Sequence, residues 1–343
     1  MLSFWYIILC AFVAVFAYLL APDNSGSANQ MHLEIHSKPP GFSVQMLHLP
    51  PNELQDQSVL DKLLNGDINN NTEIPVSEFE FTNSSIVYSP YSNGSINPIK
   101  KTISLERFKG LQKNEIIKNK KFVLGTDKYG RDLLSRMIIG TRISFFIGFI
   151  AVFISLIIGI SIGSIAGYFG GKLDNFIMWL INITWSIPTL LLVIAITLAL
   201  GKGFWQVFIA VGLTMWVEVA RVVRGQVMSV KEMQYVEAAK ALGLSDYRII
   251  FKHILPNILA PVIVISAANF AAAILIESGL SFLGIGAQPP TPSWGAMIKD
   301  HYSYIILGKA YLAVIPGLAI MSLVMAFMLI GNALRDALDV KSQ

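Results

Sequence analysis

The chain has 343 residues, of which 54% are hydrophobic and only 14% are charged. A soluble protein of this length needs a more highly charged surface, so this balance indicates a protein that faces lipid. The net charge of +4 and the lack of a dense Lys/Arg block interleaved with aromatic residues argue against a nucleic-acid partner. Cys10 is the single cysteine, which excludes an intrachain disulfide and a cysteine-based metal site.

Six apolar runs are long enough to cross a bilayer, which takes about 20 residues. They cover residues 3–21, 143–168, 176–200, 204–226, 258–278 and 311–333. The first run lacks the basic residues that precede the apolar part of a signal peptide, so we expect a retained anchor, with cleavage as the less favoured alternative. The sequence therefore predicts an all-α membrane protein with six transmembrane helices. Pro188 and Pro316 are expected to kink their helices.

Residues 22–122 differ in composition from the rest of the chain. They are rich in Asn, Ser, Pro and acidic residues and contain no spanning run. The alternation over residues 78–82 predicts a half-buried strand, and Asn93-Gly94 predicts a hairpin turn. We expect a small β-rich extracytoplasmic insertion, and a mostly unstructured loop is an equally favoured alternative.

The short loops predict the orientation. Basic residues gather at the end of the fourth run and in the loop between it and the fifth, namely Arg221, Arg224, Lys231, Lys240, Arg248 and Lys252. The positive-inside rule therefore places the loop 227–256 and both termini in the cytoplasm. Several lysines between residues 113 and 121 fall on the outer side of this arrangement, but they belong to a long loop, and long loops cross the membrane largely regardless of charge.

The cytoplasmic loop carries the most informative segment. Residues 231–242 are strong helix formers, and Gly243 suits the left-handed position that ends a helix. Ser245 is placed to cap a second helix, and Asp246 lies near its positive end. We expect two short helices with a hinge, which present small alanine side chains and the carboxylate of Glu237 to a basic partner.

This segment resembles the EAA loop of ABC importer permeases, whose pattern is Glu-Ala-Ala, three residues, Gly and a downstream Leu-Pro. The matching residues are Glu237, Ala238, Ala239, Gly243, Leu255 and Pro256. The resemblance implies a coupling helix seated in a groove of an ATPase subunit. His253 stands where Ile is often found, which leaves the contact at that position open. An ordinary Ala-rich cytoplasmic helix is the alternative for this motif taken alone.

A second motif precedes the second run and resembles the signature of the dipeptide/oligopeptide/nickel permease family, in its C-type form. Its residues are Gly125, Thr126, Asp127, Gly130, Arg131 and Asp132. The glycines permit tight turns, and Asp132 is placed to cap a helix that begins at Leu133. Arg131, Arg136 and Arg142 are candidate partners for the two aspartates. We expect an architectural extracytoplasmic turn, with direct substrate binding as the alternative.

Residues 167–174, 280–295 and 334–339 also resemble this family, although Asn332 and Val340 replace its usual Asp and Pro. The resemblance covers residues 123–343 and the first run. It implies three parts: a first transmembrane helix at 1–21, an extracytoplasmic insertion at 22–122, and a five-helix permease core at 123–343 with the coupling loop 227–256. The type I fold of ABC importer permeases is thus expected, and nothing about the insertion is inherited.

Ionisable groups inside apolar runs are costly and therefore informative. Glu277 is a candidate for the translocation path or a gate, although we favour a structural hydrogen-bonding role for it. Glu218 and Asn182 are weaker candidates. The chain has no phosphate-binding loop, no H-E-x-x-H, no G-x-S-x-G and no His/Asp/Glu cluster at metal spacing, so no catalytic or metal site is expected.

The resemblance implies a multi-pass permease subunit, in the cell inner membrane, of an ATP-driven importer for peptides or related solutes. The implied partners are a second permease subunit, two ATPase subunits that use ATP and Mg, an extracytoplasmic solute-binding protein and the lipid bilayer. No cofactor is expected in this chain. A stand-alone secondary transporter or channel is the alternative, but it predicts inverted repeats or intramembrane charge relays, which the sequence lacks. The solute stays open among dipeptide, oligopeptide, nickel chelate and peptide antibiotic.

Overall fold

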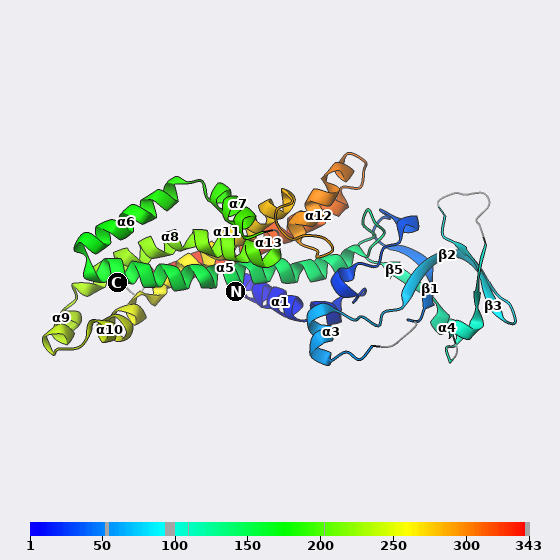
Figure 1. Cartoon of the computed structure of the whole chain (residues 1–343), viewed down its shortest axis with the longest axis horizontal. Coiled ribbons are helices and arrows are strands. Elements are labelled where there is room, and N and C mark those ends of the chain that lie inside the picture. Colours follow the sequence, from blue (N-terminus) through cyan, green and yellow to red (C-terminus); the bar gives the residue numbers. More distant parts are fainter. Residues whose placement is uncertain (52–54, 93–99, 109, 202, 340–343) are drawn as a thin grey trace. The chain divides into compact units, whose positions relative to one another are not determined.

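The computed structural model describes residues 1–51, 55–92, 100–108, 110–201 and 203–339 (Figure 1). The chain divides into two compact units. The helical unit comprises Met1–Cys10, Ser144–Gln288 and Leu318–Gln343, and the mixed unit comprises Ala11–Ile143 and Pro289–Gly317.

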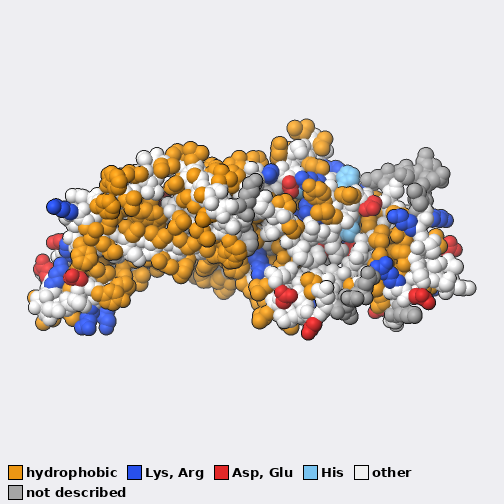
Figure 2. All heavy atoms as spheres, in the orientation of Figure 1, with side chains coloured by type: hydrophobic (Ala, Val, Ile, Leu, Met, Phe, Trp, Pro, Cys, Tyr) orange, Lys and Arg blue, Asp and Glu red, His pale blue; other side chains and the backbone are white. Residues whose placement is uncertain are grey.

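Four helices in the described part of the chain are long and apolar enough to cross a membrane. They are α5 (Leu133–Phe169), α8 (Phe204–Lys231), the helix from Asp246 that ends with α11 (Leu259–Phe282), and α13 (Tyr311–Asp339). The pair α6 (Gly171–Ser186) and α7 (Thr189–Leu200) qualifies as a fifth span if it is counted as one. Hydrophobic side chains cover the visible surface of the helical unit, as a lipid-facing protein requires (Figure 2).

The first apolar run forms a shorter helix than expected. α1 spans Leu2–Val15 and has 14 residues, which is about 21 Å, whereas a hydrocarbon core is about 30 Å thick. The backbone leaves the helical region at Phe16, and the short helix α2 (Ala17–Leu20) follows. Six spanning helices are therefore not confirmed: the described residues give four, or five with the bent pair.

The predicted third span, residues 176–200, is broken at Pro188. α6 and α7 meet there at 92°. Proline lacks an N–H, clashes with the preceding turn and forces the residue before it to be extended, as Ile187 is. The kink predicted at Pro188 is confirmed. Pro316, in contrast, lies inside α13, which continues through it as one helix.

Helices α5 and α8 approach each other closely along a row of glycines. Gly159, Gly163 and Gly167 recur at intervals of four residues, so they share one face of α5. A Cβ atom on Gly163 would lie 2.5 Å from the carbonyl oxygen of Ala220, and one on Gly167 would lie 2.7 Å from that of Arg224. Small residues at such a contact let two membrane helices pack at short range.

The mixed unit contains a five-stranded antiparallel sheet with the order β4-β3-β2-β1-β5 (Figure 1). Its strands are β1 (Phe42–Leu49), β2 (Thr72–Phe81), β3 (Ser85–Pro90), β4 (Lys101–Ser104) and β5 (Ile117–Phe122). Strand β1 lies between β2 and the edge strand β5, and its Leu47 faces Ile74 on one side and Ile117 on the other. The helices of this unit include α3 (Val59–Asn65), α4 (Lys113–Ile116) and α12 (Trp294–His301), with 3-10 turns at Gly26–Ala28, Leu33–Ile35, Leu105–Phe108 and Tyr302–Ile305.

The sheet confirms that the region between α2 and α5 is β-rich. The strand predicted over residues 78–82 is confirmed over residues 78–81, as the end of β2. A buried apolar cluster that includes Leu47, Val76 and Ile86 explains its order, because alternate side chains of three strands meet on one face. The turn predicted at Asn93-Gly94 lies outside the described residues.

Candidate functional site

The segment that resembles the EAA loop forms a helix at one end of the helical unit. α9 spans Gln234–Ala241 and is separated from α8 by a break at Glu232 and Met233, so the helix expected over 231–242 is interrupted. A turn then leads to α10 (Asp246–Ile249). Ser245 occupies the N-cap position of α10, but its side chain makes no capping hydrogen bond.

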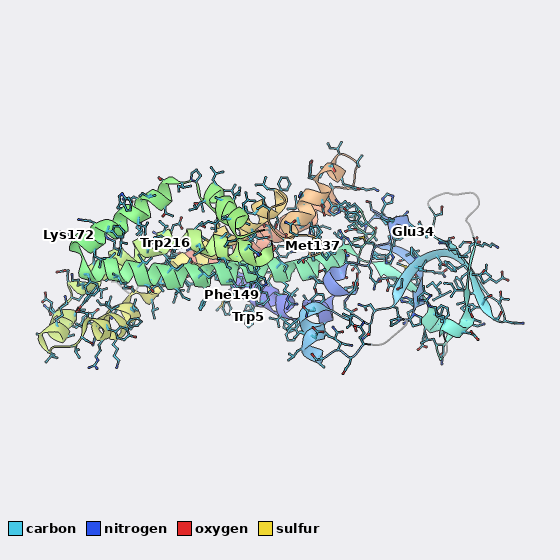
Figure 3. All side chains as sticks on the ribbon, viewed as in Figure 1. Trp5, Glu34, Met137, Phe149, Lys172 and Trp216 are labelled. Carbon is cyan, nitrogen blue, oxygen red and sulfur yellow. The ribbon has the colours of Figure 1, made fainter. Side chains whose placement is uncertain are left out.

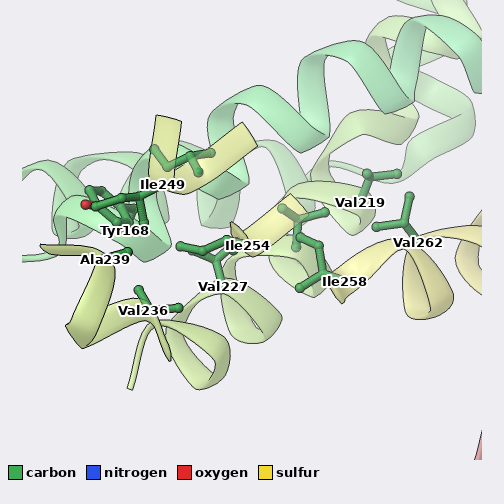
Figure 4. Close-up of a cluster of buried hydrophobic side chains, with 11 residues drawn as sticks. Tyr168, Val219, Val227, Val236, Ala239, Ile249, Ile254, Ile258 and Val262 are labelled. Atoms are coloured by element: carbon green, nitrogen blue, oxygen red, sulfur yellow. The ribbon is translucent and has the colours of Figure 1, made fainter. Parts of the chain in front are cut away.

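One face of α9 is buried in a cluster of aliphatic side chains (Figure 4). Val236 and Ala239, which are three residues apart and therefore lie on the same face, supply this contact. They pack with Val227 of α8, Ile249 of α10 and Ile254 beyond it. Burial of the valine and isoleucine side chains in this cluster holds α9 in place, since each contributes roughly 1.5–3 kcal/mol when fully buried.

The opposite face of α9 points away from the protein. Glu237, Ala238 and Lys240 are exposed, and Leu242 just after the helix is 82% exposed. Ala239 is the one matched EAA residue on this helix that faces inward. Charged side chains gather over α9 and α10 (Figure 2), and Lys172 at the start of α6 lies at the same end of the helical unit (Figure 3).

Gly243 ends α9 as the sequence predicts. Its φ is +73°, and its N–H bonds to the carbonyl of Lys240 at 2.9 Å. The N–H of Leu244 bonds back to the carbonyl of Ala239 at 3.2 Å. Together these are the two hydrogen bonds of a Schellman motif, and the left-handed conformation at Gly243 is what allows the chain to reverse there.

The second predicted helix does not end before the next span. The helix that starts at Asp246 continues to Phe282, with a π-helical stretch at Ile250–Ile254 and a 3-10 turn at Leu255–Ile258. Proline explains the irregular stretch, because Pro256 cannot donate the hydrogen bond of a regular α-turn and crowds the carbonyl of residue 252. The hinge expected between two separate short helices therefore lies only at the Gly243 turn. Leu255 is half-buried and Pro256 is exposed.

Tyr168, at the end of α5, contacts this turn and was not predicted as a functional residue. Its phenol donates a 2.6 Å hydrogen bond to Asp246 at the start of α10. The Nζ of Lys240 lies 5.3 Å from the centre of the same ring. Tyr168 therefore contacts both α9 and α10. The only signal in the sequence was an aromatic pair, Tyr168-Phe169, directly before the Gly170-Gly171 turn.

A second link joins α6 to α8 near the same end. Arg224 donates two hydrogen bonds to Asp174, at 2.5 and 2.6 Å, in the two-pronged geometry that guanidinium and carboxylate groups favour. Asp174 lies in the first turn of α6, where the helix dipole favours a negative charge. From the sequence, Arg224 was expected only to mark the cytoplasmic side of the membrane.

The signature before α5 folds into a compact turn around Asp127. This carboxylate is fully buried, accepts the backbone N–H groups of Tyr129 and Arg131, and pairs with the Arg131 guanidinium at 2.6 Å. Arg136 approaches the same carboxylate at 3.7 Å. The predicted pairing of Asp127 with Arg131 and Arg136 is thus present.

Hydrogen bonds join the signature turn to residues 32–38 of the mixed unit. The Thr126 hydroxyl donates to the carbonyl of Ile35 at 2.5 Å and accepts the N–H of Lys38 at 2.8 Å. Gly125 and Gly130 both have positive φ, and a side chain on either would collide with the backbone of this segment. These contacts fit the architectural role predicted for the turn.

Asp132 caps α5 as predicted, because its carboxylate accepts the N–H of Ser135 at 2.9 Å and also the Ser135 hydroxyl. Burial raises the pKa of this carboxyl. The third expected arginine behaves differently: Arg142 binds no aspartate and donates instead to the carbonyls of Leu63 and Leu64 in α3.

Glu277 is buried within α11 and is 1% exposed. It accepts a 2.6 Å hydrogen bond from Ser281, one turn later, and the Ser281 hydroxyl in turn accepts the N–H of Ala287 in the following loop. These contacts favour the structural role over a place on a translocation path.

Glu218 is the more accessible carboxylate. It is exposed near the middle of α8 and lines a cavity of about 150 Å³ together with Trp185 and Ile187, at the break between α6 and α7. Asn182 of α6 accepts a 3.1 Å hydrogen bond from Arg221, whose guanidinium lies 3.6 Å from the centre of the Trp185 ring. The polar groups of α6 and α8 therefore share one face of the helical unit.

No group of three or more His, Cys, Asp or Glu side chains in the described part of the chain is arranged to hold a metal ion.

Comparison with known proteins decides the family. Residues 159–341, more than half of the chain, match the family described as "Binding-protein-dependent transport system inner membrane component". The chain belongs to this family. The matched residues include the C-terminal part of α5 from Gly159 onward, the whole of the α9–α10 turn and every described long helix after α5. This inner-membrane component is thus a multi-pass protein whose family assignment agrees with its apolar helices.

Two curated relatives and one solved structure illustrate the likeness. The glutathione transport system permease protein GsiD of Pectobacterium atrosepticum is 40% identical over 218 residues, which are 64% of this chain and 72% of that protein. The dipeptide transport system permease protein DppC of Alkalihalophilus pseudofirmus is 43% identical over 217 residues, which are 63% of this chain and 71% of that protein. An inward-facing structure of the MetNI methionine ABC transporter has a TM-score of 0.49 at 18% identity, and the match covers 58% of this chain and 95% of that one.

Proposed function

We propose that this chain is the transmembrane permease subunit of an ATP-driven importer for peptides or related solutes. The names of its relatives, which transport glutathione and dipeptides, support this solute class. In this proposal the chain has no catalytic role. A second permease completes the translocation path, two ATPase subunits bind and hydrolyse ATP with Mg, and an extracytoplasmic binding protein delivers the solute.

The observation that carries the proposal is the two-faced character of α9. Val236 and Ala239 fix the helix to the ends of α8 and α10, while Glu237 and Ala238 project outward. Small side chains allow a partner to approach closely, and a carboxylate gives it a charge-assisted contact. A rigidly held helix with this outer face is suited to dock in the groove of an ATPase subunit.

The proposed coupling is mechanical. The helix from Asp246 to Phe282 is continuous, so a displacement of the α9–α10 turn would be carried along α11. Tyr168 and the Asp174–Arg224 pair would pass the same displacement to α5, α6 and α8. ATP binding in the partners would thereby shift the subunit between outward-facing and inward-facing states.

We further propose the topology expected from the basic residues. Both termini and the α9–α10 turn would lie in the cytoplasm, together with Lys172 at the same end of the helical unit (Figure 3). The insertion 22–122 and the signature turn would lie outside. Two further crossings would complete the six. The first helix at 1–21 would cross where the bilayer is locally thinned, and the bent pair α6–α7 would form the other crossing.

Within the membrane we propose that the face bearing Glu218 lines the path. An ionised carboxylate that faced lipid would be costly, whereas a water-filled path between two permeases would accommodate it. The break between α6 and α7 supports this assignment, since irregular backbone at membrane depth is tolerated where it borders protein or a cavity. Glu277 has no part in this path.

The alternative is a stand-alone secondary transporter or channel. It would move solute without ATP and would need no docking helix. The discriminating experiment is affinity capture of the tagged chain from its own membranes, followed by an assay for captured ATP hydrolysis. Replacement of Glu237 by Arg should lower the captured activity at least about tenfold, which corresponds to about 1.4 kcal/mol of binding free energy.

A matched control has the same charge reversal on the exposed Glu80 of the sheet, and Glu80→Arg should capture as much activity as the unaltered chain. If Glu237→Arg and Glu80→Arg capture equal activity, α9 is not the docking helix. If the purified chain alone moves solute without ATP, the secondary-transporter alternative replaces the proposal.

A further inference from the structure

The short helix α3 in the insertion is amphipathic. Its sequence places Val59, Leu60, Leu63 and Leu64 within an arc of about 140° around the helix axis. Asp61, Lys62 and Asn65 occupy the opposite arc. A helix with this pattern that rests on a protein core turns its apolar arc inward.

In α3 the apolar arc is turned outward instead. Val59 is 83% exposed, Leu60 is 70% exposed and Leu64 is 54% exposed, and no residue of the helix is buried. The polar Asp61 and Lys62 are less exposed than these aliphatic side chains. The apolar side of α3 therefore faces away from the protein, where a polar side would be expected.

The polar side chains of α3 form their hydrogen bonds and ion pair within the insertion. Asn65 donates to Asp61 at 2.6 Å, and Lys62 pairs with Asp67 at 3.2 Å. Ser58 caps the start of the helix by accepting the N–H of Asp61. These local contacts stabilise α3 as a helix with a defined start and end.

The end of α3 is fixed to the rest of the mixed unit. Arg142 donates to the carbonyls of Leu63 and Leu64 at 3.2 and 2.8 Å, and its guanidinium lies 5.6 Å from the centre of the Tyr18 ring. Gly66, which follows the helix with φ +87°, is so close to the backbone of Asn24 that a Cβ atom would lie 2.7 Å from its carbonyl oxygen.

These contacts place α3 at the level of a membrane surface. Arg142 directly precedes the apolar run 143–168 of α5, and arginine and tyrosine side chains are typical of the boundary between lipid and water. α2 contacts α3 and also exposes large apolar side chains, since Leu19 is 67% exposed and Leu20 is 44% exposed. The apolar face of α3 therefore continues the exposed apolar surface of α2.

We propose that α3 is an interfacial helix that inserts Val59, Leu60 and Leu64 into the bilayer surface where the insertion leaves the membrane. The occupant of this face is lipid, because the bilayer already surrounds the chain at the level of Arg142 and an outward apolar arc is what an interfacial helix presents. The helix would thereby hold the five-stranded sheet at a fixed height above the membrane. In the region of α3, hydrophobic side chains lie at the surface beside acidic ones (Figure 2).

The test measures the depth of spin labels in the full-length chain. Cys10 is replaced by Ser, and a single cysteine is introduced as Leu60→Cys or, as the matched control on the polar arc, Asp61→Cys. Each labelled protein is reconstituted in vesicles of phosphatidylethanolamine and phosphatidylglycerol. Collision rates are then measured with oxygen, which concentrates in lipid, and with a water-soluble nickel chelate.

The proposal predicts that the ratio of oxygen to nickel collisions is several-fold higher at position 60 than at position 61. If both labels collide freely with the nickel chelate, the apolar face of α3 is exposed to water and the proposal is wrong. If the label at position 60 is shielded from both reagents, protein covers the face and the proposal is also wrong. The result does not depend on ATPase capture, so this inference and the proposed function fail separately.

Discussion

The phenol of Tyr168 at the end of α5 donates a 2.6 Å hydrogen bond to the carboxylate of Asp246 at the start of α10. This contact joins residues that are far apart in the sequence across the turn at Gly243. Replacement of Tyr168 by Phe should destabilise the turn by about 1–2 kcal/mol, since a hydrogen bond to a charged group is lost. Thermal unfolding in detergent measures this, and captured ATPase activity should fall in parallel.

Tyr247 supplies the control for Tyr168→Phe, because this residue is 70% exposed. Tyr247→Phe should leave the unfolding temperature unchanged. Equal shifts for the two variants would mean that the hydrogen bond to Asp246 contributes nothing to the turn.

Replacement by alanine should change stability in opposite directions at two glycines, both of which have space for a side chain. Gly243 has φ +73°, so Gly243→Ala should cost about 1–2 kcal/mol through backbone strain alone. Gly225 lies inside α8 with no atom within 4 Å of its would-be Cβ, so Gly225→Ala should stabilise the helix by about 0.5–1 kcal/mol. Unfolding temperatures measured side by side check both signs, and a stabilising Gly243→Ala would refute the left-handed turn.

The buried carboxylate of Asp127 should matter far more than the half-exposed Asp300. Asp127→Asn leaves Arg131 and Arg136 without their shared partner, and breaking a buried pair in this way costs about 3–5 kcal/mol. Asp300 pairs with Lys128 at 3.0 Å and keeps 33% of its side chain exposed, so Asp300→Asn should cost less than about 1 kcal/mol. Resistance of the mixed unit to proteolysis ranks the variants, and similar protection for both would contradict the buried-pair assignment.

Acidification should lower the folding stability of the mixed unit. Burial lowers the pKa of His32 and that of His48, which flank Glu73 from two sides. The unfolded chain then takes up protons first, below about pH 6.5, so stability is lost as the pH falls through that value toward the folded-state pKa values. Protease cleavage within residues 22–122 should therefore increase between neutral pH and pH values near 5.

The double variant His32→Gln/His48→Gln should show a smaller increase in cleavage over the same pH range. An increase as large as that of the unaltered chain would assign the pH dependence to other groups.

The features that follow from local chemistry could be predicted from the sequence. The apolar runs, the break at Pro188, the cap by Asp132 and the left-handed Gly243 each depend on a few neighbouring residues. The strand at residues 78–81 followed from its alternation.

The features that depend on distant residues could not be predicted. Arg142 was expected to pair with an aspartate of its own motif, but α3 offers it two free carbonyls at the end of a helix. Tyr168 contacts Asp246 only because α5, α9 and α10 converge, and nothing in either local sequence indicates it. Glu277 and Glu218 look alike as carboxylates in apolar runs, yet Ser281 satisfies one while the other is exposed beside a helix break.

The central claim is that the α9 turn faces the cytoplasm, where an ATPase subunit can reach it. In a Cys10→Ser background, Ala238→Cys is treated with a membrane-impermeant maleimide in spheroplasts and in inside-out membrane vesicles, and Glu80→Cys in the sheet is the control for the opposite side. The account predicts that position 238 is labelled only in inside-out vesicles and position 80 only in spheroplasts. Labelling of position 238 in intact spheroplasts would contradict it.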